Sequence, residues 1–487
     1  MLLRTLNLSK ERVSQIIDNQ MNIETVESAL NDPQLQHLRP QLLMRYGKLQ
    51  QKNRNYSGAA NTYRSLLSQF PQAPQSIQAR QLNDLMIALE KTNPYAIGAV
   101  LPLTGKNANI GQHALNAIKM GLGIADNNAN SRYKLYVFDN QSQPQLSANG
   151  VQKLILDYKV IAIIGGLSSK EATTIAETSD LLSIPFMALT QKSGLTQTGD
   201  FVFRNSLTPE MQVGRLVQYA SEKLNAKRFA VLYPNDSYGV EFANIYWDEV
   251  LRQGGQITAA QTYDPKINDF TGVVQKLIGT YYPEARKAEY DERVENMKKV
   301  LRDREKKLKK ENKKIVKNLR EHQVQENVLP PVADFDVLFV PDTGKALSQV
   351  ISFMKVNDVT GLTYLGTNIW NTPDVIRRST GQKDRIFFTG VLDQTDPEFK
   401  NLPFYKNYIG YFNEDPTLIE IQAFEAGRII LDQIQSGADS RNSLASRLRS
   451  LGRVSGVGTE LTMNENRELV RPVRLFTTES GSVRKIE

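Results

Sequence analysis

Two patterns of hydrophobic and polar positions follow one another along this 487-residue chain, and the change falls at Asn93-Pro94. Before it, apolar residues recur at helical spacing. Val13, Ile16 and Ile17, for example, share one face of a helix expected to begin near Ser9. After it, short apolar runs alternate with amphipathic stretches of about 10 to 15 residues. This alternation predicts a parallel, doubly wound sheet with helices on both faces.

The predicted elements are defined by these runs. Strands are expected at Ala96–Leu101, Lys134–Phe138, Val160–Gly165, Phe229–Leu232, Gln256–Thr262, Val337–Val340, Leu362–Gly366, Phe387–Thr389 and Arg471–Thr477. Helices are expected at Gly111–Ile124, Gln145–Tyr158, Tyr238–Gln253 and Ile419–Ser436. We therefore expect a two-lobed α/β fold in residues 93–487. The first lobe would span about 93–210 plus a C-terminal return segment, and the second about 211–400.

Residues 1–92 are predicted to be all-α. The clearest stretch lies between residues 43 and 71, where several residues fall at the spacings of a tetratricopeptide repeat: Leu43, Tyr46, Gly47, Ala59, Tyr63, Leu66 and Pro71. Only one repeat matches, and Gln50 and Arg54 depart from the pattern, so a generic helical hairpin stays open. An αα layer of either kind normally presents a surface to a protein partner.

Residues 284–327 interrupt the second lobe. Apolar residues recur there at intervals of three, four or seven, between dense charges: Tyr290, Val294, Met297, Leu301, Leu308 and Ile315. This spacing predicts an inserted, solvent-exposed charged helix or helical hairpin. Arg304 and Glu311 break the apolar seam, so a coiled coil is only one of the alternatives, and Pro330-Pro331 ends the segment.

The net charge of +8 belongs to this arm. Between Lys298 and Arg320 there are 12 Lys or Arg and three Asp or Glu, so the rest of the chain is close to neutral. Such an arm could bind anionic lipid headgroups, cell-wall polymers or an acidic partner, or it could be a helix kept soluble by its charges. Interleaved aromatic residues are absent there, and a nucleic-acid partner is not expected.

Composition and motifs disfavour an enzyme and a cofactor. The chain has no Cys and three widely separated His, which excludes thiol chemistry and makes a metal site unexpected. No GxSxG motif occurs, and His113 is expected to be a surface or capping residue rather than a base. Asp139 follows a strand, but without GxGxxG or a Walker loop a nucleotide site is disfavoured.

The N-terminus and the hydropathy bear on location. No apolar run approaches the roughly 20 residues that a transmembrane helix needs. The first residues, MLLRTLNLSKERVSQ, lack the apolar core of a signal peptide. Two interpretations stay open: a cytoplasmic protein, or a mature domain without its leader.

In open α/β sheets, ligands bind beyond the carboxyl ends of strands. The most suggestive segment of that kind is Gly166-Leu-Ser168-Ser169, whose hydroxyls and helix-start amides suit a carboxylate. The alternative is that Ser168 or Ser169 only caps its own helix.

Several segments in this order resemble the leucine/isoleucine/valine-binding (type I) periplasmic solute-binding proteins. They are IGAVLPLTGKNANIG (97–111), YVFDNQSQP (136–144), VIAIIGGLSS (160–169), IPFMALTQKSGLTQTGDFVFRN (184–205), FAVLYPNDSYG (229–239) and GTELTMNENRELVRPVRLF (458–476). The resemblance implies two Rossmann-like lobes joined by a hinge, with a cleft that can close on a ligand.

The resemblance also implies ligand contacts. The ligand carboxylate would be contacted by Ser168 or Ser169, with a second contact from Thr190 or Gln191. The second lobe would contribute Tyr238.

The family also supplies an acid that pairs with the ligand's ammonium group. The position of that acid holds the neutral Asn368, which puts a standard amino acid in doubt because a buried cation needs a partner. Asp342 could substitute for the missing acid.

A narrower resemblance is to the penicillin-binding protein activators. It rests on the helical N-terminal region together with SYGVEFANIYWDEVLRQGG (237–255) and FDVLFVPDTGKA (335–346). Members of that family are outer-membrane lipoproteins that stimulate peptidoglycan synthases. The resemblance therefore implies a periplasmic protein, although the cysteine that carries the lipid is absent from this sequence.

Two functional hypotheses follow. The first is a non-enzymatic regulator whose partner is a peptidoglycan synthase or another cell-envelope protein. The second is a solute-binding receptor that delivers an amino acid or another small polar ligand to an ABC transporter.

Overall fold

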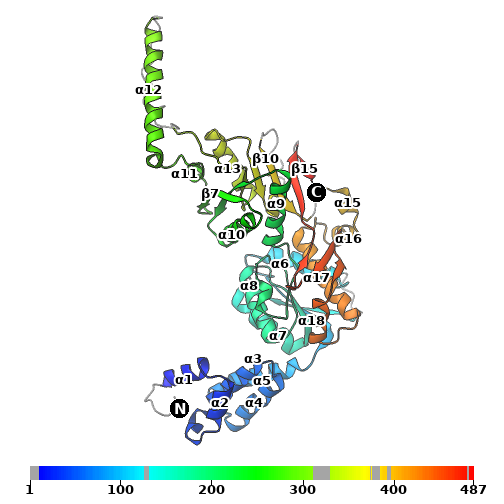
Figure 1. The fold of residues 1–487 in the computed structure, drawn as a ribbon. Helices are drawn as coiled ribbons and strands as arrows, with labels where there is room; N and C mark the ends of the chain where they lie inside the picture. The colour runs from blue at the N-terminus through cyan, green and yellow to red at the C-terminus, as the bar shows by residue number, and fades with distance from the viewer. Residues whose placement is uncertain are drawn as a thin grey trace. The chain divides into compact units, whose positions relative to one another are not determined.

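The computed structural model describes residues 10–125, 131–310, 329–372, 375, 384–391, 396–479 and 482–486 (Figure 1). The chain divides into two compact units. Unit 1 comprises Met1–Leu207 and Thr395–Pro472, and unit 2 comprises Thr208–Gln394 and Val473–Glu487. Each unit contains a mainly parallel sheet covered by helices, and unit 1 begins with a helical region. The predicted α/β class, with two lobes and an all-α N-terminal region, is confirmed.

Sheet 1, in unit 1, has the strand order β2-β1-β3-β4-β5, and all its neighbours are parallel. Its strands are β1 (Asn93–Leu101), β2 (Lys134–Asp139), β3 (Val160–Gly165), β4 (Phe186–Ala188) and β5 (Val202–Arg204). Helices α7 and α8 pack on one face, and α6 and α17 pack on each other over the opposite face. All six residues of β3 are buried, which accounts for the unbroken apolar run predicted there.

The other elements of unit 1 are α6 (Ala108–Gly121), α7 (Pro144–Tyr158), α8 (Ser169–Leu181), η2 (Leu195–Thr198), α15 (Pro397–Asn401), α16 (Pro403–Phe412), α17 (Leu418–Gln435) and α18 (Arg441–Arg449). A small antiparallel sheet consists of β11 (Arg453–Ser455), β12 (Glu460–Met463) and β13 (Leu469–Val470).

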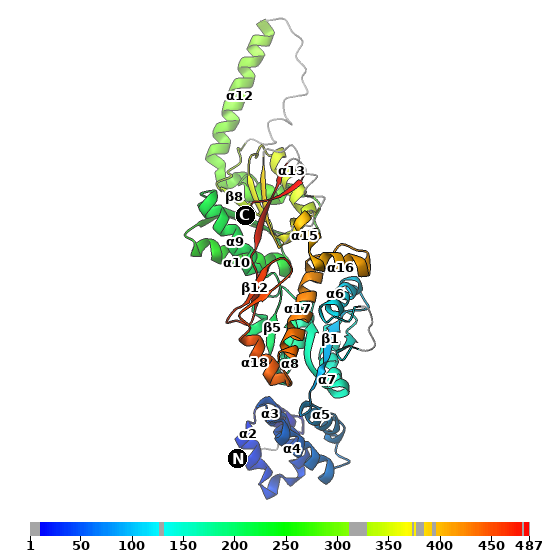
Figure 2. The same cartoon turned by 90° about the vertical axis from the view of Figure 1, so that its right-hand side faces the viewer.

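The N-terminal helices pack on the α7–α8 side of sheet 1 (Figure 2). They are α1 (Lys10–Asn19), α2 (Ile23–Leu30), η1 (Pro33–Leu38), α3 (Arg39–Lys52), α4 (Tyr56–Gln69) and α5 (Gln75–Leu89). Helices α3 and α4 form a hairpin in which Gly47 faces Tyr63, and a Cβ on Gly47 would lie 2.4 Å from Tyr63 Cε1. The two helices therefore pack closely at Gly47, while the assignment of the hairpin to the tetratricopeptide class stays a prediction.

Sheet 2, in unit 2, has the order β15-β14-β10-β9-β8-β6-β7. Its strands are β6 (Arg228–Pro234), β7 (Gln256–Tyr263), β8 (Val337–Phe339), β9 (Thr363–Gly366), β10 (Arg385–Gly390), β14 (Arg474–Glu479) and β15 (Ser482–Lys485). The predicted C-terminal strand is β14, which pairs antiparallel with β10. Alternate side chains of β6 enter two cores: Phe229 and Val231 face α9 (Pro209–Lys223) and α10 (Ser237–Arg252), and Ala230 and Leu232 face α11 (Thr271–Leu277) and α13 (Gly344–Val356).

The described part of the predicted insertion contains η3 (Pro283–Arg286) and helix α12 (Lys287–Lys310), and α12 extends away from the sheet of its unit (Figure 1). Residues 311–327 of the predicted arm lie outside the described residues. Arg286 links the two ends of the insertion. Its Nη1 donates to the carbonyl oxygens of Gly279 (3.2 Å) and Pro330 (2.8 Å). In the described part of the chain, no helix is both long and apolar enough to cross a membrane.

Candidate functional site

The four residues predicted for a ligand site in the first lobe lie on two adjacent loops of unit 1. Ser168 and Ser169 follow β3, and Thr190 and Gln191 follow β4. Because β3 and β4 are parallel neighbours, both loops leave the sheet at its carboxyl edge. The topology therefore places all four residues at the edge where α/β sheets bind ligands.

Ser168 is the N-cap of α8. Its side chain accepts from the N–H of Glu171, and the Glu171 side chain accepts from the N–H of Ser168, which completes a capping box. The Glu171 side chain is almost fully buried, at 1% exposure. A carboxylate of the protein therefore already complements the N-terminus of α8, which reduces its attraction for an anionic ligand. The capping alternative left open for this segment holds for Ser168, while Ser169 is exposed on the first turn.

The loop after β4 is held by Arg204, a buried residue at the end of β5. Its Nη1 donates to the carbonyl oxygens of Gln191, at 3.2 Å, and Lys192, and its Nη2 forms an ion pair with Glu468. Thr190 is buried, and its hydroxyl accepts from the N–H of Lys192 at 3.3 Å. The backbone of this loop is thus fixed in advance, which suits a binding surface that does not rearrange.

Asp139, at the end of β2, has a structural role. Its carboxylate accepts from the N–H groups of Leu103, Thr104 and Gln141 and from the Thr104 hydroxyl. Burial alone would raise the pKa of Asp139, but these hydrogen bonds outweigh it and hold the pKa below its usual value. The side chain therefore links two loops at this edge and does not resemble a free ribose-binding acid.

The residues predicted for the second lobe gather at the carboxyl edge of sheet 2. Tyr238, at the start of α10, shares a 2.8 Å hydrogen bond with the hydroxyl of Thr367 after β9. Burial holds the pKa of Tyr238 well above its usual value, so the phenol stays protonated. Next to Thr367, the N–H of Asn368 donates to Gln212 Oε1 at 2.9 Å, and Thr389 donates to the same oxygen. Asn368 Oδ1 is buried and accepts no hydrogen bond among the described residues.

Asp342 follows β8 at the same edge and is only partly buried. The Tyr263 hydroxyl donates to Asp342 Oδ2 at 2.5 Å, and the N–H of Thr343 donates to Oδ1 at 2.5 Å. Trp370 Nε1 donates to the carbonyl oxygen of Asp342 at 2.6 Å. A carboxylate has about four acceptor positions. Asp342 therefore keeps acceptor capacity for a donor group of a ligand.

The sequence missed the residues that position these side chains. They are Glu171 and Arg204 in unit 1 and Gln212, Tyr263 and Thr367 in unit 2. Only Glu171 had a local signal, because Ser168-x-x-Glu171 is the spacing of a capping box. The others are distant in sequence from the groups they contact.

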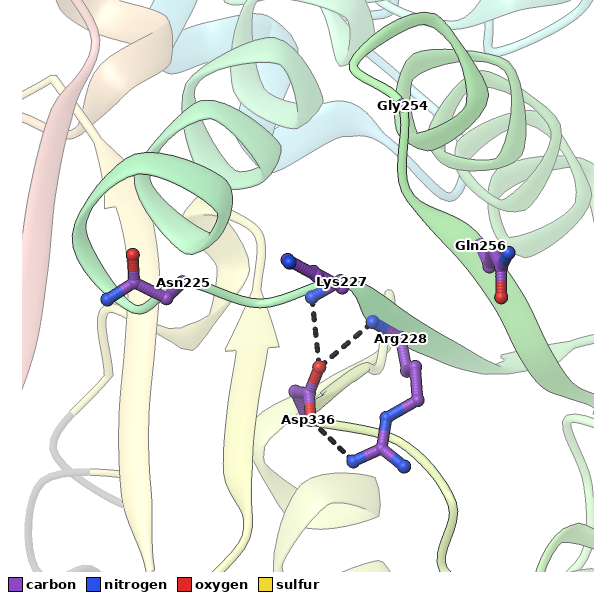
Figure 3. Close-up of a pocket in the computed structure, with 6 residues that line it drawn as sticks. All are labelled: Asn225, Lys227, Arg228, Gly254, Gln256 and Asp336. Carbon is purple, nitrogen blue, oxygen red and sulfur yellow. Dashed lines mark hydrogen bonds and ion pairs between the residues drawn. The ribbon is translucent and has the colours of Figure 1, made fainter.

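Unit 2 has a pocket of about 470 Å³ at the other edge of its sheet, near the amino ends of β6, β7 and β8 (Figure 3). Asn225, Lys227, Arg228, Gly254, Gln256 and Asp336 line it. Asp336 accepts from the N–H groups of Lys227 and Arg228, at 2.9 Å each, and forms an ion pair with Arg228. Asp334 contacts the same guanidinium. These two carboxylates balance the charge of Arg228, so the pocket is not a strong anion site.

His113, on α6, lies between two carboxylates of unit 1. Its Nδ1 is 2.7 Å from Glu420 Oε1, and its Nε2 is 3.3 Å from Glu414 Oε2. Glu420 is buried and completes the capping box of α17, so its role is structural. Among the described residues, no group of three or more His, Cys, Asp or Glu is arranged to hold a metal ion.

Comparison with known proteins agrees with the fold described above. Residues 94–280 match the family described as periplasmic binding protein. The leucine-binding protein LivK of Thermotoga maritima is similar, with a TM-score of 0.56 and 18% identity over 80% of this chain and 97% of LivK. LivJ of Streptococcus pneumoniae, in complex with isoleucine, gives 0.55 and 18% over 81% of this chain and 99% of LivJ. No curated protein matches the sequence.

A solute-binding protein of an ABC transporter from Rhodopseudomonas palustris, in complex with 3,4-dihydroxybenzoic acid, is also similar. Its TM-score is 0.55 at 16% identity, and the alignment covers 80% of this chain and 95% of that chain. At these identities the likeness shows the fold. The chain has the type I periplasmic binding protein fold, and one fifth of it lies outside the alignment.

Proposed function

We propose that this protein is a non-enzymatic, periplasmic regulator that binds a peptidoglycan synthase, as the penicillin-binding protein activators do. The observation that carries the proposal is the firm attachment of the N-terminal helices to the first lobe. A helical layer normally presents a protein-binding surface. Here that layer belongs to the same compact unit as sheet 1.

The attachment combines a shared apolar core with several polar contacts. Residues of α3, α4 and α5 belong to the same core cluster as α7, α8 and the strands of sheet 1. Arg54 forms a 3.0 Å ion pair with Asp180, and the Tyr56 hydroxyl bonds to Ser183 Oγ at 2.7 Å. Buried Arg441, on α18, donates to the carbonyl of Leu89 at 2.8 Å. A partner bound to the helices would thus be held rigidly against unit 1.

The carboxyl edges of the two sheets give weaker support to an amino-acid receptor. In unit 1, Glu171 already places a carboxylate at the N-terminus of α8, where a ligand carboxylate is expected to bind. In unit 2, Asn368 is neutral at the position where the receptor family has an acid. Both features lower the expected affinity for a zwitterionic amino acid.

The proposal predicts a binding surface on the exposed side of α5. Ile77 is 76% exposed there, and Arg80 is exposed one turn further along. Exposed apolar residues at an interface are common sites of large affinity loss. We expect Ile77→Asp to weaken binding of the full chain to a purified peptidoglycan synthase about tenfold or more, measured by surface plasmon resonance.

The matched control is Val356→Asp in unit 2, where the apolar side chain is 70% exposed. It introduces the same charge at a similar exposure and is expected to leave binding unchanged. Equal binding of both variants and the wild type would contradict a surface on α5. The absence of any binding by the wild type to peptidoglycan synthases would contradict the function itself.

A second candidate is a receptor for a small carboxylate-containing ligand. It is supported by the fold, by the isoleucine and 3,4-dihydroxybenzoic acid in two similar proteins, and by the free acceptor Asn368 Oδ1. Binding stabilises the folded protein by mass action. Millimolar amino acids and aromatic acids should then raise Tm in the wild type and less in Ser169→Ala. Unchanged Tm with every compound would contradict a receptor.

A further inference from the structure

Helix α12 carries a continuous apolar stripe of the kind that pairs with another helix. Tyr290, Val294, Met297 and Leu301 follow the 4-3-4 spacing of a coiled-coil seam. None of the described side chains of α12 is buried, and beside the stripe Val300 is 66% exposed. In the described part of the chain, the helix packs against η3 at its base. Within the described ranges, this apolar face is therefore exposed and accessible to a partner.

The charges of α12 are unevenly distributed along its axis. Residues 287–297 contain four acidic and two basic residues, whereas residues 298–310 contain eight basic and two acidic residues. Two such helices side by side in parallel would place like charges together. An antiparallel pair places the acidic half of each helix against the start of the basic half of the other.

We propose that α12 pairs antiparallel with α12 of a second copy of this chain. In this register, Val294 packs against Met297 of the second copy, and Tyr290 packs against Leu301 of the second copy. The overlap spans about residues 287–304. Each helix contributes all four apolar residues of the stripe, and most of the basic distal segment stays outside the overlap.

Charge complementarity beside the stripe selects this register. Asp291 and Lys298 occupy equivalent flanking positions, directly after the seam residues Tyr290 and Met297, and the antiparallel pair sets Asp291 of each copy against Lys298 of the other. In a parallel pair, Arg293 would instead face Lys298 and repel it. In the single chain Lys298 pairs with Glu295 at 3.1 Å on an exposed surface. Such surface pairs are weak and exchange readily.

The interface is short, so the association is expected to depend on concentration. The apolar stripe covers only about two heptads, and coiled coils of that length are weak alone. At rising concentration, sedimentation analysis should show the full chain moving from 54.9 kDa toward twice that mass. Met297→Asp, which places two carboxylates in the paired stripe, should leave the protein monomeric.

A charge swap tests the register without disturbing the fold, because the residues concerned are exposed. Asp291→Lys and Lys298→Asp alone should each weaken the dimer about tenfold, since each turns two attractive pairs into two repulsive ones. The double variant should restore wild-type association. Glu292→Lys is the matched control, because its side chain lies on the outer face of the pair and should leave the dimer unchanged.

Disulfide trapping tests the orientation, and the chain has no cysteine of its own. In the antiparallel register, Tyr290→Cys and Leu301→Cys proteins should form a mixed disulfide when combined under mild oxidation. Neither alone should cross-link, because the two copies of position 301 lie about 16 Å apart along the axis at 1.5 Å per residue.

Three results would overturn the proposal. One is a monomer at all concentrations, which would leave the stripe to another segment of the same chain or to a different protein. Another is failure of the double charge swap to restore the dimer. A third is homodimeric cross-linking of the Leu301→Cys protein, which would indicate a parallel pair.

Discussion

The two helical additions to the binding fold differ in how they are attached. The N-terminal helices share a core with α7 and α8 of unit 1, and buried Arg441 donates a hydrogen bond to the carbonyl of Leu89, the last residue of α5. Helix α12 packs against η3, and none of its described side chains is buried. Apolar contacts supply most of the stability of a helix in a protein. Substitutions in the first addition should therefore destabilise the protein, and substitutions in the second should act mainly on association.

The largest effect is expected at Gly47. A Cβ at this position would lie 2.4 Å from the Tyr63 ring, in the hairpin of α3 and α4. Gly47→Val should lower the free energy of unfolding by about 3 kcal/mol, because the closely packed hairpin must open to admit the side chain. Urea unfolding of the full chain measures this loss of unfolding free energy.

Gly410→Ala is the matched control for Gly47→Val. Gly410 lies on α16, and a Cβ there would meet no atom within 4 Å. This change should leave stability unchanged or raise it by up to about 1 kcal/mol through helix propensity. Equal midpoints for Gly47→Val and the wild type would show that the hairpin is not closely packed.

Arg441 is the next test of the attachment. Its Nε donates to the Val160 carbonyl at 3.0 Å and its Nη1 to the Leu89 carbonyl at 2.8 Å. Burial lowers the pKa of Arg441 to about 10, so the group is still charged at neutral pH. Arg441→Met leaves both carbonyls without this donor but also removes a buried charge, so we expect a net loss of about 2 kcal/mol.

The control is Arg447→Met on the same helix, where the side chain is only partly buried. Its effect on the unfolding free energy should stay within about 0.5 kcal/mol. Differential scanning calorimetry of both variants compares them directly. A loss at Arg447 as large as that at Arg441 would mean that the effect comes from helix α18 in general and not from the bond to α5.

The pH dependence of the unfolding free energy distinguishes a carboxylate held by several hydrogen bonds, such as Asp139, from an exposed one, such as Glu289. The pKa of Asp139 is lowered, so the stability it contributes is present above its unfolded pKa and is lost as pH falls through the folded pKa. Asp139→Asn should destabilise the protein by about 1 kcal/mol at pH 7, and this destabilisation should shrink as the pH falls below about 4 and through the lowered folded pKa. On α12, hydrogen bonds from Arg286 lower the pKa of Glu289, yet that side chain is exposed. Glu289→Gln should leave the pH profile of unfolding unchanged.

The sequence predicted the elements that have a strong local pattern. The run at 160–165 was predicted as a strand and is β3, because a strand buried on both faces is apolar throughout. Strands β4 and β5 were not predicted, since three residues each are too few for a period to show.

The candidate site was predictable only in part. The strand ends identify the segment that holds Ser168 and Ser169, because parallel strands leave a sheet at a common edge. Tyr238 and Asn368 were indicated only by the resemblance to solute-binding proteins. Gln212 and Asn368 are separated by 156 residues, and Tyr263 and Asp342 by 79. Pairs at such distances are created by the tertiary fold, and no local spacing in one sequence indicates them.

The smallest effect is expected on α12. Glu289 and Arg293 form an exposed ion pair at 3.2 Å, and such pairs contribute little to stability. Replacing both by Ala should leave the free energy of unfolding of the whole protein unchanged within error. Hydrogen exchange at low protein concentration measures the local consequence: amides of α12 should exchange by local opening and faster in the variant, whereas amides of α5 should exchange slowly and equally in both. Equal protection of α12 and α5 in the wild type would contradict the difference in attachment, because a helix outside the core has no packing that must be broken before it opens.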